Sequence, residues 1–297
     1  MRFDTPLIMN KKKDQKTLAV VMACHNRREK TLSCLRALSQ QSIYNSVSIE
    51  AYLLDDGSTD NTSDAVKIEF PNVHVLMSGG NLFWNRGMRE SFSAAILKGF
   101  DFYLWLNDDS ILYKNALQIL LETYSRLKEQ GHDCVIIGSA MQDPVSQQFT
   151  YGGIIRHRLH WGRVKLERIA PANEAVQCDA TNGNCVLIPS SVVQKVGNLD
   201  PVFLHRWGDH DYCFRALEHG CSVWLAPGYL GTCKDNPIEG TWEDTSLPIM
   251  ERLRKLNSPR GFQFRDYAIY LRRHRGPWWP VHLLWPYVKI VMQSITH

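Results

Sequence analysis

The first 140 residues alternate continuous apolar runs with segments of helical periodicity, and this rhythm restricts the chain to few folds. The apolar runs include Thr17–Cys24 (TLAVVMAC) and Phe100–Leu106 (FDFYLWL). Such runs are typical of strands in a parallel sheet that helices cover on both faces. Between them, Leu32, Leu35 and Leu38 recur at helical spacing. The alternation predicts an α/β fold of the Rossmann-like, doubly wound type, with a mostly parallel sheet.

Further elements are predicted on the same grounds. The strands of the first half are Val47–Leu54, Val73–Met77 and Cys134–Ser139. Its helices are Glu29–Gln41, Thr59–Ile68 with Asp60 as cap, Met88–Lys98 and Lys114–Glu129. Beyond about residue 140 the predicted strands are Gln147–Ile155, His160–Glu167, Asn184–Ile188 and Ser222–Leu225, and the predicted helices are Ser190–Val196 and His210–His219.

These elements divide the chain into three parts. Residues 1–16 are predicted to form a leader, and residues 17–245 one α/β domain whose second half is mixed. Residues 246–297 read as a helical C-terminal appendage rich in basic and aromatic residues. No Gly/Ser-rich linker separates the two halves of the domain, so we expect one structural unit there.

Charge and cysteine content exclude several classes of protein. The net charge of +4 is too small to indicate nucleic acid as a partner. The eight cysteines include no CxxC pair, which argues against a zinc ribbon, and neither a secretory signal nor an 18-residue apolar stretch is present. We therefore expect free, mostly buried thiols in a reducing cytosol.

Polar clusters follow three of the predicted strands. They are His25-Asn26-Arg27, Asp55-Asp56-Gly57-Ser58 and Asn107-Asp108-Asp109. Ligands of open α/β sheets bind beyond the carboxyl ends of the strands. If the three strands are parallel neighbours, these clusters converge on one edge of the sheet.

Each acidic cluster has a functional and a structural interpretation. Oxygen ligands such as those of Asn107, Asp108 and Asp109 suit Mg²⁺ or Mn²⁺, which also bind phosphate oxygens of a ligand. The same residues could form a solvated turn, with Asp109 capping the next helix. Asp55 and Asp56 could accept a hydrogen bond from a nucleobase or a ribose hydroxyl, or could simply form a turn and cap.

A second group of candidates lies in the segment WGDHDYCFRA. Asp209 could act as a general base or as a helix cap, and Asp211 could pair with Arg215 at i,i+4. His205, just before this segment, and His210, within it, are weak candidates. Four aromatic residues could stack on sugar rings or belong to the core: Trp84, Tyr151, Trp161 and Trp207.

Other nucleotide and hydrolase signatures are missing from the sequence. No GxGxxG follows the first strand, and neither GxxxxGK[ST] nor GxSxG occurs. These absences argue against dinucleotide binding, P-loop chemistry and a serine hydrolase.

The ordered set of motifs resembles the family-2 glycosyltransferases of bacteria, which are inverting enzymes of GT-A fold. VVMACHNR is similar to their TxNR opening, LLDDGSTDNT to their nucleotide-binding motif, and LWLNDDS to their DxD-type metal motif. NLFWNRGM, TYGG, CDATNGNCVLIP, GDHDYCFRA and APGYLGTC follow in the order of a bacterial subgroup. The resemblance covers about residues 17–290.

The resemblance implies a role for each matching residue. Asp209 would be the catalytic base, and Asp109 with Asn107 would hold the divalent metal, Mg²⁺ or Mn²⁺. The nucleotide-sugar ligands would be Ala23, His25, Asn26, Arg27, Asp55, Asp56, Asn81, Trp84, Asn107 and Asp108. Weaker acceptor-binding candidates are Asn182, Gly183, Trp207 and Asp211. The nucleotide-binding half would span about residues 17–140 and the acceptor half about residues 141–245.

The chain departs from the family pattern at two places. Gly208 stands where the first residue of the frequent "ED" pair is expected, which leaves the acceptor contacts open. Gly231-Thr232-Cys233 stands where many relatives have a histidine that ligates the metal, which leaves the third metal ligand open.

The implied activity is transfer of a sugar from a nucleotide-diphosphate donor to a hydroxyl of a glycan or lipid-linked acceptor, in bacterial cell-surface polysaccharide synthesis. One alternative is a non-catalytic protein that binds nucleotide sugars at the membrane. Another is a nucleotidyltransferase, although the Gly-rich, basic first loop that favours this chemistry is missing. The implied location is the cytoplasm, peripheral on the inner face of the cytoplasmic membrane.

The charge of the C-terminal region bears on this location. Residues 251–297 hold nine Lys and Arg against two acids, a net charge of +7, while the rest of the chain has a net charge of −3. Arginines 272, 273 and 275, followed by Trp278, Trp279, Trp285 and Tyr287, have the composition of a helix that lies in an anionic membrane interface. The alternative is a helix that packs these aromatic residues on the domain.

Overall fold

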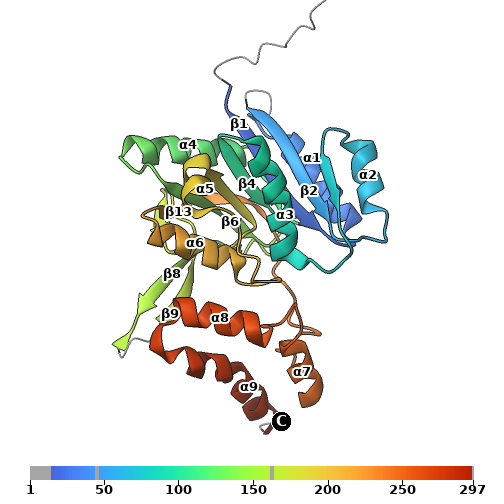
Figure 1. Cartoon of the computed structure of the whole chain (residues 1–297), viewed down its shortest axis with the longest axis vertical. Coiled ribbons are helices and arrows are strands. Elements are labelled where there is room, and N and C mark those ends of the chain that lie inside the picture. Colours follow the sequence, from blue (N-terminus) through green and yellow to red (C-terminus); the bar gives the residue numbers. More distant parts are fainter. Residues whose placement is uncertain (1–14, 44–46, 161–163, 296–297) are drawn as a thin grey trace, which may run out of the picture.

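The computed structural model describes residues 15–43, 47–160 and 164–295. Most of the predicted leader and Trp161 therefore lie outside the described residues. An α/β domain forms one end of the molecule, and the last three α-helices lie beneath it (Figure 1). These helices are α7 (Ile249–Leu256), α8 (Phe264–His274) and α9 (Trp279–Ile295), with the 3₁₀ turn η2 (Gly276–Trp278) before α9.

The main sheet has strand order β10-β13-β6-β12-β4-β1-β2-β3. The parallel group on one side comprises β1 (Thr17–Cys24), β2 (Ser48–Asp55), β3 (His74–Met77) and β4 (Phe102–Leu106). The other side comprises β6 (Val135–Gln142), β10 (Val176–Cys178), β12 (Cys185–Pro189) and β13 (Ser222–Thr232). Strand β12 is antiparallel to both β4 and β6, whereas β6 and β13 are parallel. The predicted mostly parallel, doubly wound sheet is confirmed.

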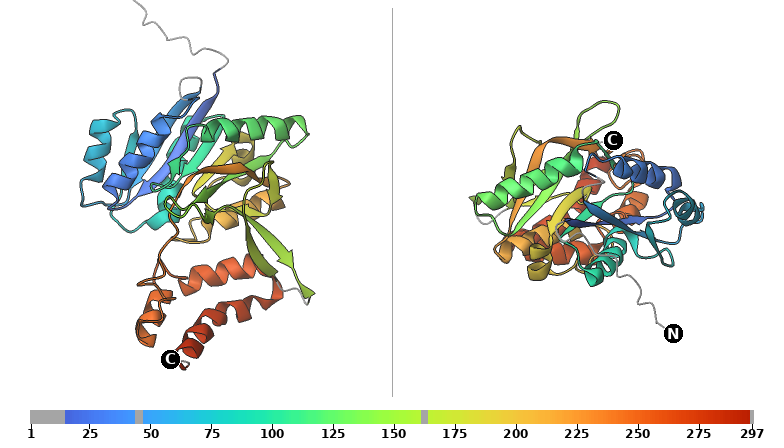
Figure 2. Two further views of the ribbon diagram at one scale, coloured as in Figure 1. Left: turned by 180° about the vertical axis from the view of Figure 1, so that it is seen from behind. Right: turned by 90° about the horizontal axis from the view of Figure 1, so that it is seen from above.

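Short strands complete the architecture. β5 (Ile111–Leu112) pairs with β13, and β7 (Phe149–Tyr151) pairs with β6. A separate antiparallel sheet has order β11-β8-β9, made of β8 (Gly153–Arg158), β9 (Val164–Ile169) and β11 (Ala180–Thr181). The β8–β9 hairpin extends from the domain toward the C-terminal helices (Figures 1 and 2).

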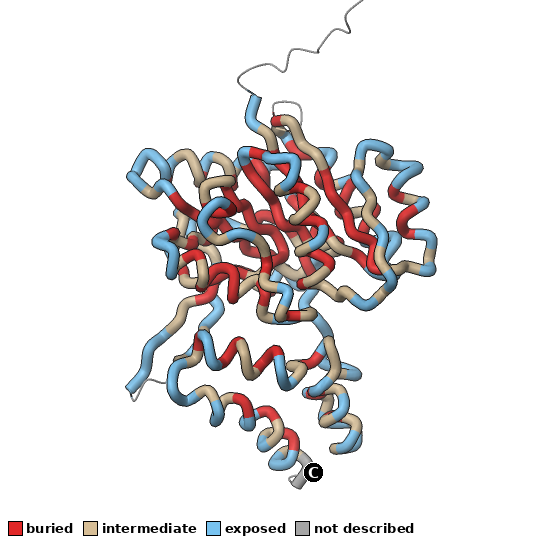
Figure 3. Tube along the Cα trace, in the orientation of Figure 1, coloured by how far each residue is buried: buried red, intermediate tan, exposed pale blue. Residues whose placement is uncertain are grey.

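Helices cover both faces of the main sheet, as the view from above shows (Figure 2). The helices of one face are α1 (Arg28–Ser39), α2 (Thr62–Glu69) and α4 (Ala116–Glu129), and those of the other are α3 (Phe83–Lys98), α5 (Ser190–Val196) and α6 (Gly208–Glu218). Alternate side chains of each central strand enter one of two cores: Leu18 and Val20 lie in the first, and Ala19 and Val21 in the second. The strands are therefore buried on both faces (Figure 3).

Two helix starts, those of α2 and α3, differ from the predictions by three residues or more. Helix α3 begins at Phe83 instead of Met88, because the Asp56 carboxylate accepts hydrogen bonds from the backbone N–H groups of Leu82 and Phe83. Helix α2 begins at Thr62, and Asp60 lies one position before its N-cap. The Asp60 side chain accepts from the backbone N–H of Thr62 and also from that of Arg28, so it serves two helices.

Cysteine pairing also differs from the expectation of free thiols throughout. A disulfide joins Cys134 to Cys221, at the starts of the parallel neighbours β6 and β13, with a Cα–Cα distance of 4.6 Å. The remaining six cysteines are free and buried, as expected.

Helix α8 belongs to the main hydrophobic core. Its Tyr267, Tyr270 and Leu271 are buried in the same cluster as the residues under α3 and α6. Helix α9 packs on α8 and contributes Leu283 to this cluster. The C-terminal helices are thus fixed beneath the edge of the sheet at which β1, β2 and β4 end (Figure 1).

Candidate functional site

The carboxyl edge of the sheet brings the three polar clusters together. Cys24 pairs with Asp55 at the ends of β1 and β2, so the segments that follow them lie side by side. The Asn26 backbone N–H donates to Ser58 Oγ at 2.8 Å, and Asn26 Oδ1 accepts from the Thr59 N–H at 2.7 Å. The backbone of Asn26 has a left-handed conformation, with φ of 50°.

Arg27 joins the first cluster to the third. Its Nη1 donates to Asp108 Oδ1 at 3.0 Å and to Asp109 Oδ2 at 2.8 Å. Burial opposes the charge of Arg27, but the two carboxylates outweigh this effect and raise its pKa. Asp108 and Asp109, hereafter the diacid pair, are thereby held beside one cation.

The two side chains of the diacid pair differ in their exposure to solvent. The Asp108 side chain is only 6% exposed, and its Oδ2 has no hydrogen-bond partner among the described residues. Burial raises the pKa of Asp108 to about 6, against the lowering effect of Arg27. Asp109 is more accessible and lies 4.0 Å from Lys30 Nζ. The diacid pair therefore offers one buried oxygen without a partner and one accessible carboxylate, and both residues contact Arg27.

These residues fit a divalent cation that shares its coordination with a bound phosphate. Among the described residues, no group of three or more His, Cys, Asp or Glu side chains is arranged to hold a metal. Mg²⁺ nevertheless binds through one or two carboxylates plus substrate phosphates and water, which matches the diacid pair. The Asn107 side-chain oxygen accepts from Trp84 Nε1 at 2.7 Å, so that oxygen has a protein partner already.

Cys233 occupies the position where the family resemblance implies a histidine ligand. Its Sγ lies 3.6 Å from Asp109 Oδ1 and 3.3 Å from Asn184 Nδ2. Burial raises the pKa of the Cys233 thiol to about 12. The neutral thiol contacts the diacid pair, a proximity that sequence spacing did not reveal.

Asp55 and Asp56 use their carboxylates within the protein. Asp55 is buried and accepts from the Ser58 N–H at 2.8 Å and from the Ser63 hydroxyl. Asp56 accepts from Ser78 Oγ at 2.7 Å and from the backbone N–H groups of residues 80, 82 and 83. Burial acts to raise the pKa of Asp56, but these hydrogen bonds prevail and lower it. Asp55 fixes the turn after β2, and Asp56 fixes the backbone between β3 and α3.

Trp84 connects the diacid pair to the start of α6. While its indole N–H donates to Asn107, its ring lies against Gly183, where a Cβ would stand 2.5 Å from Trp84 Cζ2. The Gly183 N–H in turn donates to Asp209 Oδ2 at 3.0 Å. A row of contacts thus runs from Asn107, which immediately precedes the diacid pair, through Trp84 and Gly183 to Asp209.

Asp209, the candidate base, lies at the far end of this row of contacts. It lies half-buried in the first turn of α6, and its Oδ1 accepts from the His210 N–H at 2.9 Å. Backbone N–H groups at a helix start stabilise a carboxylate. Each carboxylate oxygen has two lone pairs, so Asp209 can accept a further hydrogen bond.

The structure explains why glycine precedes Asp209. A Cβ at Gly208 would overlap the side chain of Asn85, whose amide donates to the carbonyl oxygens of Asp200 at 2.9 Å and Phe203 at 2.8 Å. Asn85 therefore fills the space that a larger side chain at position 208 would need.

Asp211 and Trp207 fasten α6 to α8. Asp211 is fully buried and accepts from Arg215, Arg273 and His274 at 2.8 to 3.0 Å. The predicted pairing with Arg215 is confirmed. Burial acts to raise the pKa of Asp211, but the His274 and Arg215 hydrogen bonds prevail and lower it. Trp207 stacks on two α8 rings, those of Tyr267 and Tyr270, at centroid distances of 5.0 and 4.6 Å.

The remaining predicted residues lie around this centre in different environments. Ala23 is half-buried at the end of β1, and His25 Nδ1 lies 2.6 Å from the Asp56 carbonyl oxygen. Asn81 is exposed at the tip of the loop before α3. The Oδ1 of Asn182 is buried and has no hydrogen-bond partner among the described residues. Tyr151 is buried at the end of β7, under the Arg168 guanidinium.

His205, a weak candidate in the sequence, positions Trp84. Its Nδ1 lies 3.3 Å from the Trp84 backbone nitrogen and accepts that N–H, which requires Nδ1 to be unprotonated. Burial, together with Arg206 and other nearby arginines, lowers the pKa of His205 to about 4. The imidazole is therefore neutral at physiological pH.

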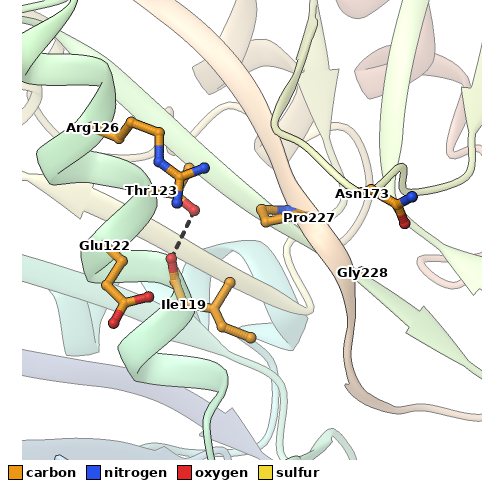
Figure 4. A pocket seen from close by; sticks show the side chains of 7 residues that line it. All are labelled: Ile119, Glu122, Thr123, Arg126, Asn173, Pro227 and Gly228. Carbon is orange, nitrogen blue, oxygen red and sulfur yellow. Dashed lines mark hydrogen bonds between the residues drawn. The ribbon is translucent and has the colours of Figure 1, made fainter.

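Two cavities in the described residues lie away from this edge. The larger, of about 300 Å³, lies between α4 and β13. Figure 4 shows Ile119, Glu122, Thr123 and Arg126 of α4 on one side and Pro227 and Gly228 of β13 opposite. The other, of about 150 Å³, lies between α1 and the segment after α2. Neither includes a predicted site residue.

Solved structures with the same architecture define the class of fold, which is the GT-A fold of glycosyltransferases. A mannosyltransferase from Pyrobaculum calidifontis, in complex with GDP-Man and Mn²⁺, matches 95% of this chain and 74% of its own, with 12% identity and a TM-score of 0.55. S. aureus TarS (residues 1–349) matches 87% of this chain and 71% of its own, with 13% identity and a TM-score of 0.51. GalNAc-T7 with UDP, GalNAc and Mn²⁺ matches 89% of this chain and 58% of its own, with 14% identity and a TM-score of 0.56.

The chain belongs to glycosyl transferase family 2, whose sequence model matches residues 19–182. A curated relative from Mycobacterium tuberculosis is 24% identical over 277 residues, covering 84% of this chain and 83% of the relative. That relative is N-acetylglucosaminyl-diphospho-decaprenol L-rhamnosyltransferase, and the same match occurs in two strains.

Proposed function

We propose that this chain is a metal-dependent, inverting glycosyltransferase that moves a sugar from a nucleotide-diphosphate donor to a hydroxyl of a lipid-linked or glycan acceptor, in cell-surface polysaccharide synthesis. The observation that carries the proposal is the row of contacts from Asn107, which immediately precedes the diacid pair, through Trp84 and Gly183 to Asp209. On this proposal the donor diphosphate would lie near one end of the row and the base near the other.

The acceptor class follows from the curated relative. By its name, that protein transfers rhamnose to N-acetylglucosaminyl-diphospho-decaprenol, a lipid-linked sugar. The match extends over most of both chains and therefore includes the segments around Asp209. We assign the donor and acceptor to the cytoplasmic side of the membrane.

The donor diphosphate would lie at the diacid pair. Asp109 and Asp108 would hold the divalent cation, with Asp108 Oδ2 as the buried oxygen available to it. A bound cation stabilises the negative charge that develops on the leaving nucleoside diphosphate. Arg27, which contacts both carboxylates, is available to bind a phosphate oxygen once the cation takes over its partners.

The base and the donor would then act in one displacement. Asp209 removes the proton of the acceptor hydroxyl as that oxygen attacks the anomeric carbon from the face opposite the diphosphate. The bond to the diphosphate breaks, and the configuration at the anomeric carbon inverts. A single carboxylate suffices, in contrast to glycoside hydrolases, which use a pair.

A nucleotide-sugar panel with and without Mn²⁺ tests the proposal. We expect one donor to raise the melting temperature in a concentration-dependent and Mn²⁺-dependent manner, and to release nucleoside diphosphate when acceptor is added. Asp209→Asn should abolish transfer and keep the donor-induced shift. Asp64→Asn, which changes an exposed aspartate in the first turn of α2, is the matched control.

Other results would identify the alternatives. Undiminished transfer by Asp209→Asn would remove the assigned base. Metal-dependent nucleotide binding without turnover on any acceptor would favour a non-catalytic binding protein. Release of pyrophosphate instead of nucleoside diphosphate would indicate a nucleotidyltransferase.

A further inference from the structure

Helix α9 presents an apolar face to solvent. Six residues recur at i, i+3, i+4, i+7, i+10 and i+11 and are each between 43% and 56% exposed: Val281, Leu284, Trp285, Val288, Val291 and Met292. We call them the α9 outer face. The opposite side of the helix packs inward through Leu283 and Ile290, which are buried. An apolar helical face of this kind that is exposed to solvent marks an interaction site.

Neighbouring apolar side chains enlarge this face. Trp278, immediately before α9, is exposed, and so is Phe264 at the start of α8. The Phe264 ring lies 6.4 Å from that of Tyr287 on α9. Residues that are apolar and aromatic together suit the boundary between lipid chains and headgroups.

The charge of the C-terminal helices indicates which occupant suits this face. Lys289 is the one charged residue of α9, and it pairs with Glu243 at 3.1 Å. Four arginines of the three C-terminal helices and their connections are exposed, and none has an ion-pair partner among the described residues: Arg254, Arg260, Arg265 and Arg272. Two copies of the chain meeting here would bring together two segments of net charge +7. Anionic lipid headgroups would instead neutralise that charge.

We propose that the α9 outer face docks on the surface of a membrane that contains anionic lipids. No helix in the described part of the chain has the length and apolar character needed to cross a bilayer, so the contact is interfacial. The structure also revises which C-terminal residues take part. Arg273 is engaged with Asp200 and Asp211, and Arg275 donates to the Val164 carbonyl oxygen.

The position of the face relative to Asp209 gives docking a use. Helix α9 packs on α8, and α8 stacks Tyr267 and Tyr270 on Trp207, two residues before Asp209. Helix α8 therefore lies between α6, which carries Asp209 in its first turn, and α9 (Figure 1). On the proposed function, docking would bring the acceptor end of the site to the membrane that holds a lipid-linked acceptor.

Vesicle cosedimentation of the full chain tests the proposal. We expect binding to phosphatidylcholine vesicles that contain phosphatidylglycerol, weaker binding to phosphatidylcholine alone, and a decrease with salt. The substitutions Leu284→Glu, Trp285→Glu and Val288→Glu, made together, should lower the partition coefficient at least tenfold. The matched control makes the same change at three exposed apolar residues elsewhere, Ile68→Glu, Leu97→Glu and Val145→Glu, which are 83% to 90% exposed. It should bind within twofold of the parent.

Two further measurements keep the test decisive. If the glutamate variant does not fold, quenching of tryptophan fluorescence by brominated lipids should occur in the parent and decrease in Trp285→Phe. Equal binding by the α9 variant and its control, or no binding by the parent, would overturn the proposal. A parent dimer that the α9 variant dissociates, without vesicle binding, would assign the face to a second copy of the chain. None of these outcomes depends on donor turnover, so they stand apart from the test of the proposed function.

Discussion

Two glycines near Asp209 show how much of the site depends on single residues. Gly208 leaves room for Asn85, and Gly183 leaves room for the Trp84 ring. From the sequence, Gly208 is a departure from the family pattern, and no local signal connects it with a residue 123 positions earlier. Packing between distant segments is settled by tertiary structure, which a motif does not record.

Adding one methyl group at Gly183 should disturb the site. Gly183→Ala would force Trp84 away from Asn107, and we expect at least a tenfold loss in kcat/KM and a stability cost of about 1–3 kcal/mol. Gly79→Ala is the control, since its Cβ would have no neighbour within 4 Å. Steady-state kinetics and thermal melting measure both effects. Wild-type kinetics in Gly183→Ala would show that Trp84 does not position the site.

His205 should make stability depend on pH. Its pKa lies at about 4 in the folded chain and near 6.5 in the unfolded chain, so the unfolded state binds more protons between these values. Its neutral form therefore stabilises the fold above about pH 6.5, and this contribution is lost as the pH falls toward 4. Between pH 7 and pH 5 we expect the parent to lose on the order of 1–2 kcal/mol through this group.

A substitution isolates the histidine from other acid effects. His205→Asn keeps an acceptor for the Trp84 N–H and cannot be protonated, so its unfolding free energy should fall less between pH 7 and pH 5. His219→Asn, at an exposed histidine after α6, should retain the parental fall. Identical pH profiles for the parent and His205→Asn would refute the assignment. Urea unfolding at each pH provides the measurement.

At the scale of elements, hydrophobic periodicity predicted the position of most helices and strands, because burial on one or both faces leaves a local pattern. Periodicity failed where the start of a helix or the place of a strand depends on residues that are distant in the sequence. The start of α3 depends on Asp56, and the antiparallel insertion of β12 between β4 and β6 has no local signature. The stacking of Trp207 on α8 was likewise invisible, since Trp207 read equally well as a sugar platform or a core residue.

The junction of α6 and α8 should be sensitive to one carboxylate. Asp211→Asn removes the buried charge that Arg215, Arg273 and His274 share, and we expect a loss of about 3 kcal/mol in unfolding free energy. Glu251→Gln, which breaks an exposed i,i+4 pair with Lys255, should cost less than about 0.5 kcal/mol. Denaturant unfolding compares the two. A loss as small as that of the control would show that stacking alone holds α8.

At the scale of the whole molecule, the sequence predicted the class of fold and the edge at which polar clusters gather. The class of fold follows from the alternation of strands and helices, and the edge follows from the rule that parallel strands end together. It could not place the C-terminal helices, because their basic and aromatic residues suit either a membrane or a core. In the structure α8 lies in the core, whereas the α9 outer face lies in solvent.

The cavity between α4 and β13 should be irrelevant to transfer. It is the larger of the two cavities, but its lining contains none of the phosphate-binding or base candidates. Arg126→Ala should leave kcat and the donor KM within twofold, whereas Arg27→Ala should raise the donor KM at least tenfold, because Arg27 contacts both members of the diacid pair. A large effect of Arg126→Ala on KM would relocate the donor site.

The internal hydrogen bonds of Asp55 and Asp56 have a consequence for how relatives of this chain are interpreted. Purifying selection on folding alone would retain both aspartates, since together they hold the turn after β2 and the backbone that leads into α3. A descendant that had lost catalysis would therefore keep the DDGS signature long after Asp209 was free to drift, because Asp209 accepts only two backbone hydrogen bonds from the described residues. Among such descendants, the informative position for separating enzymes from pseudoenzymes is the first turn of α6.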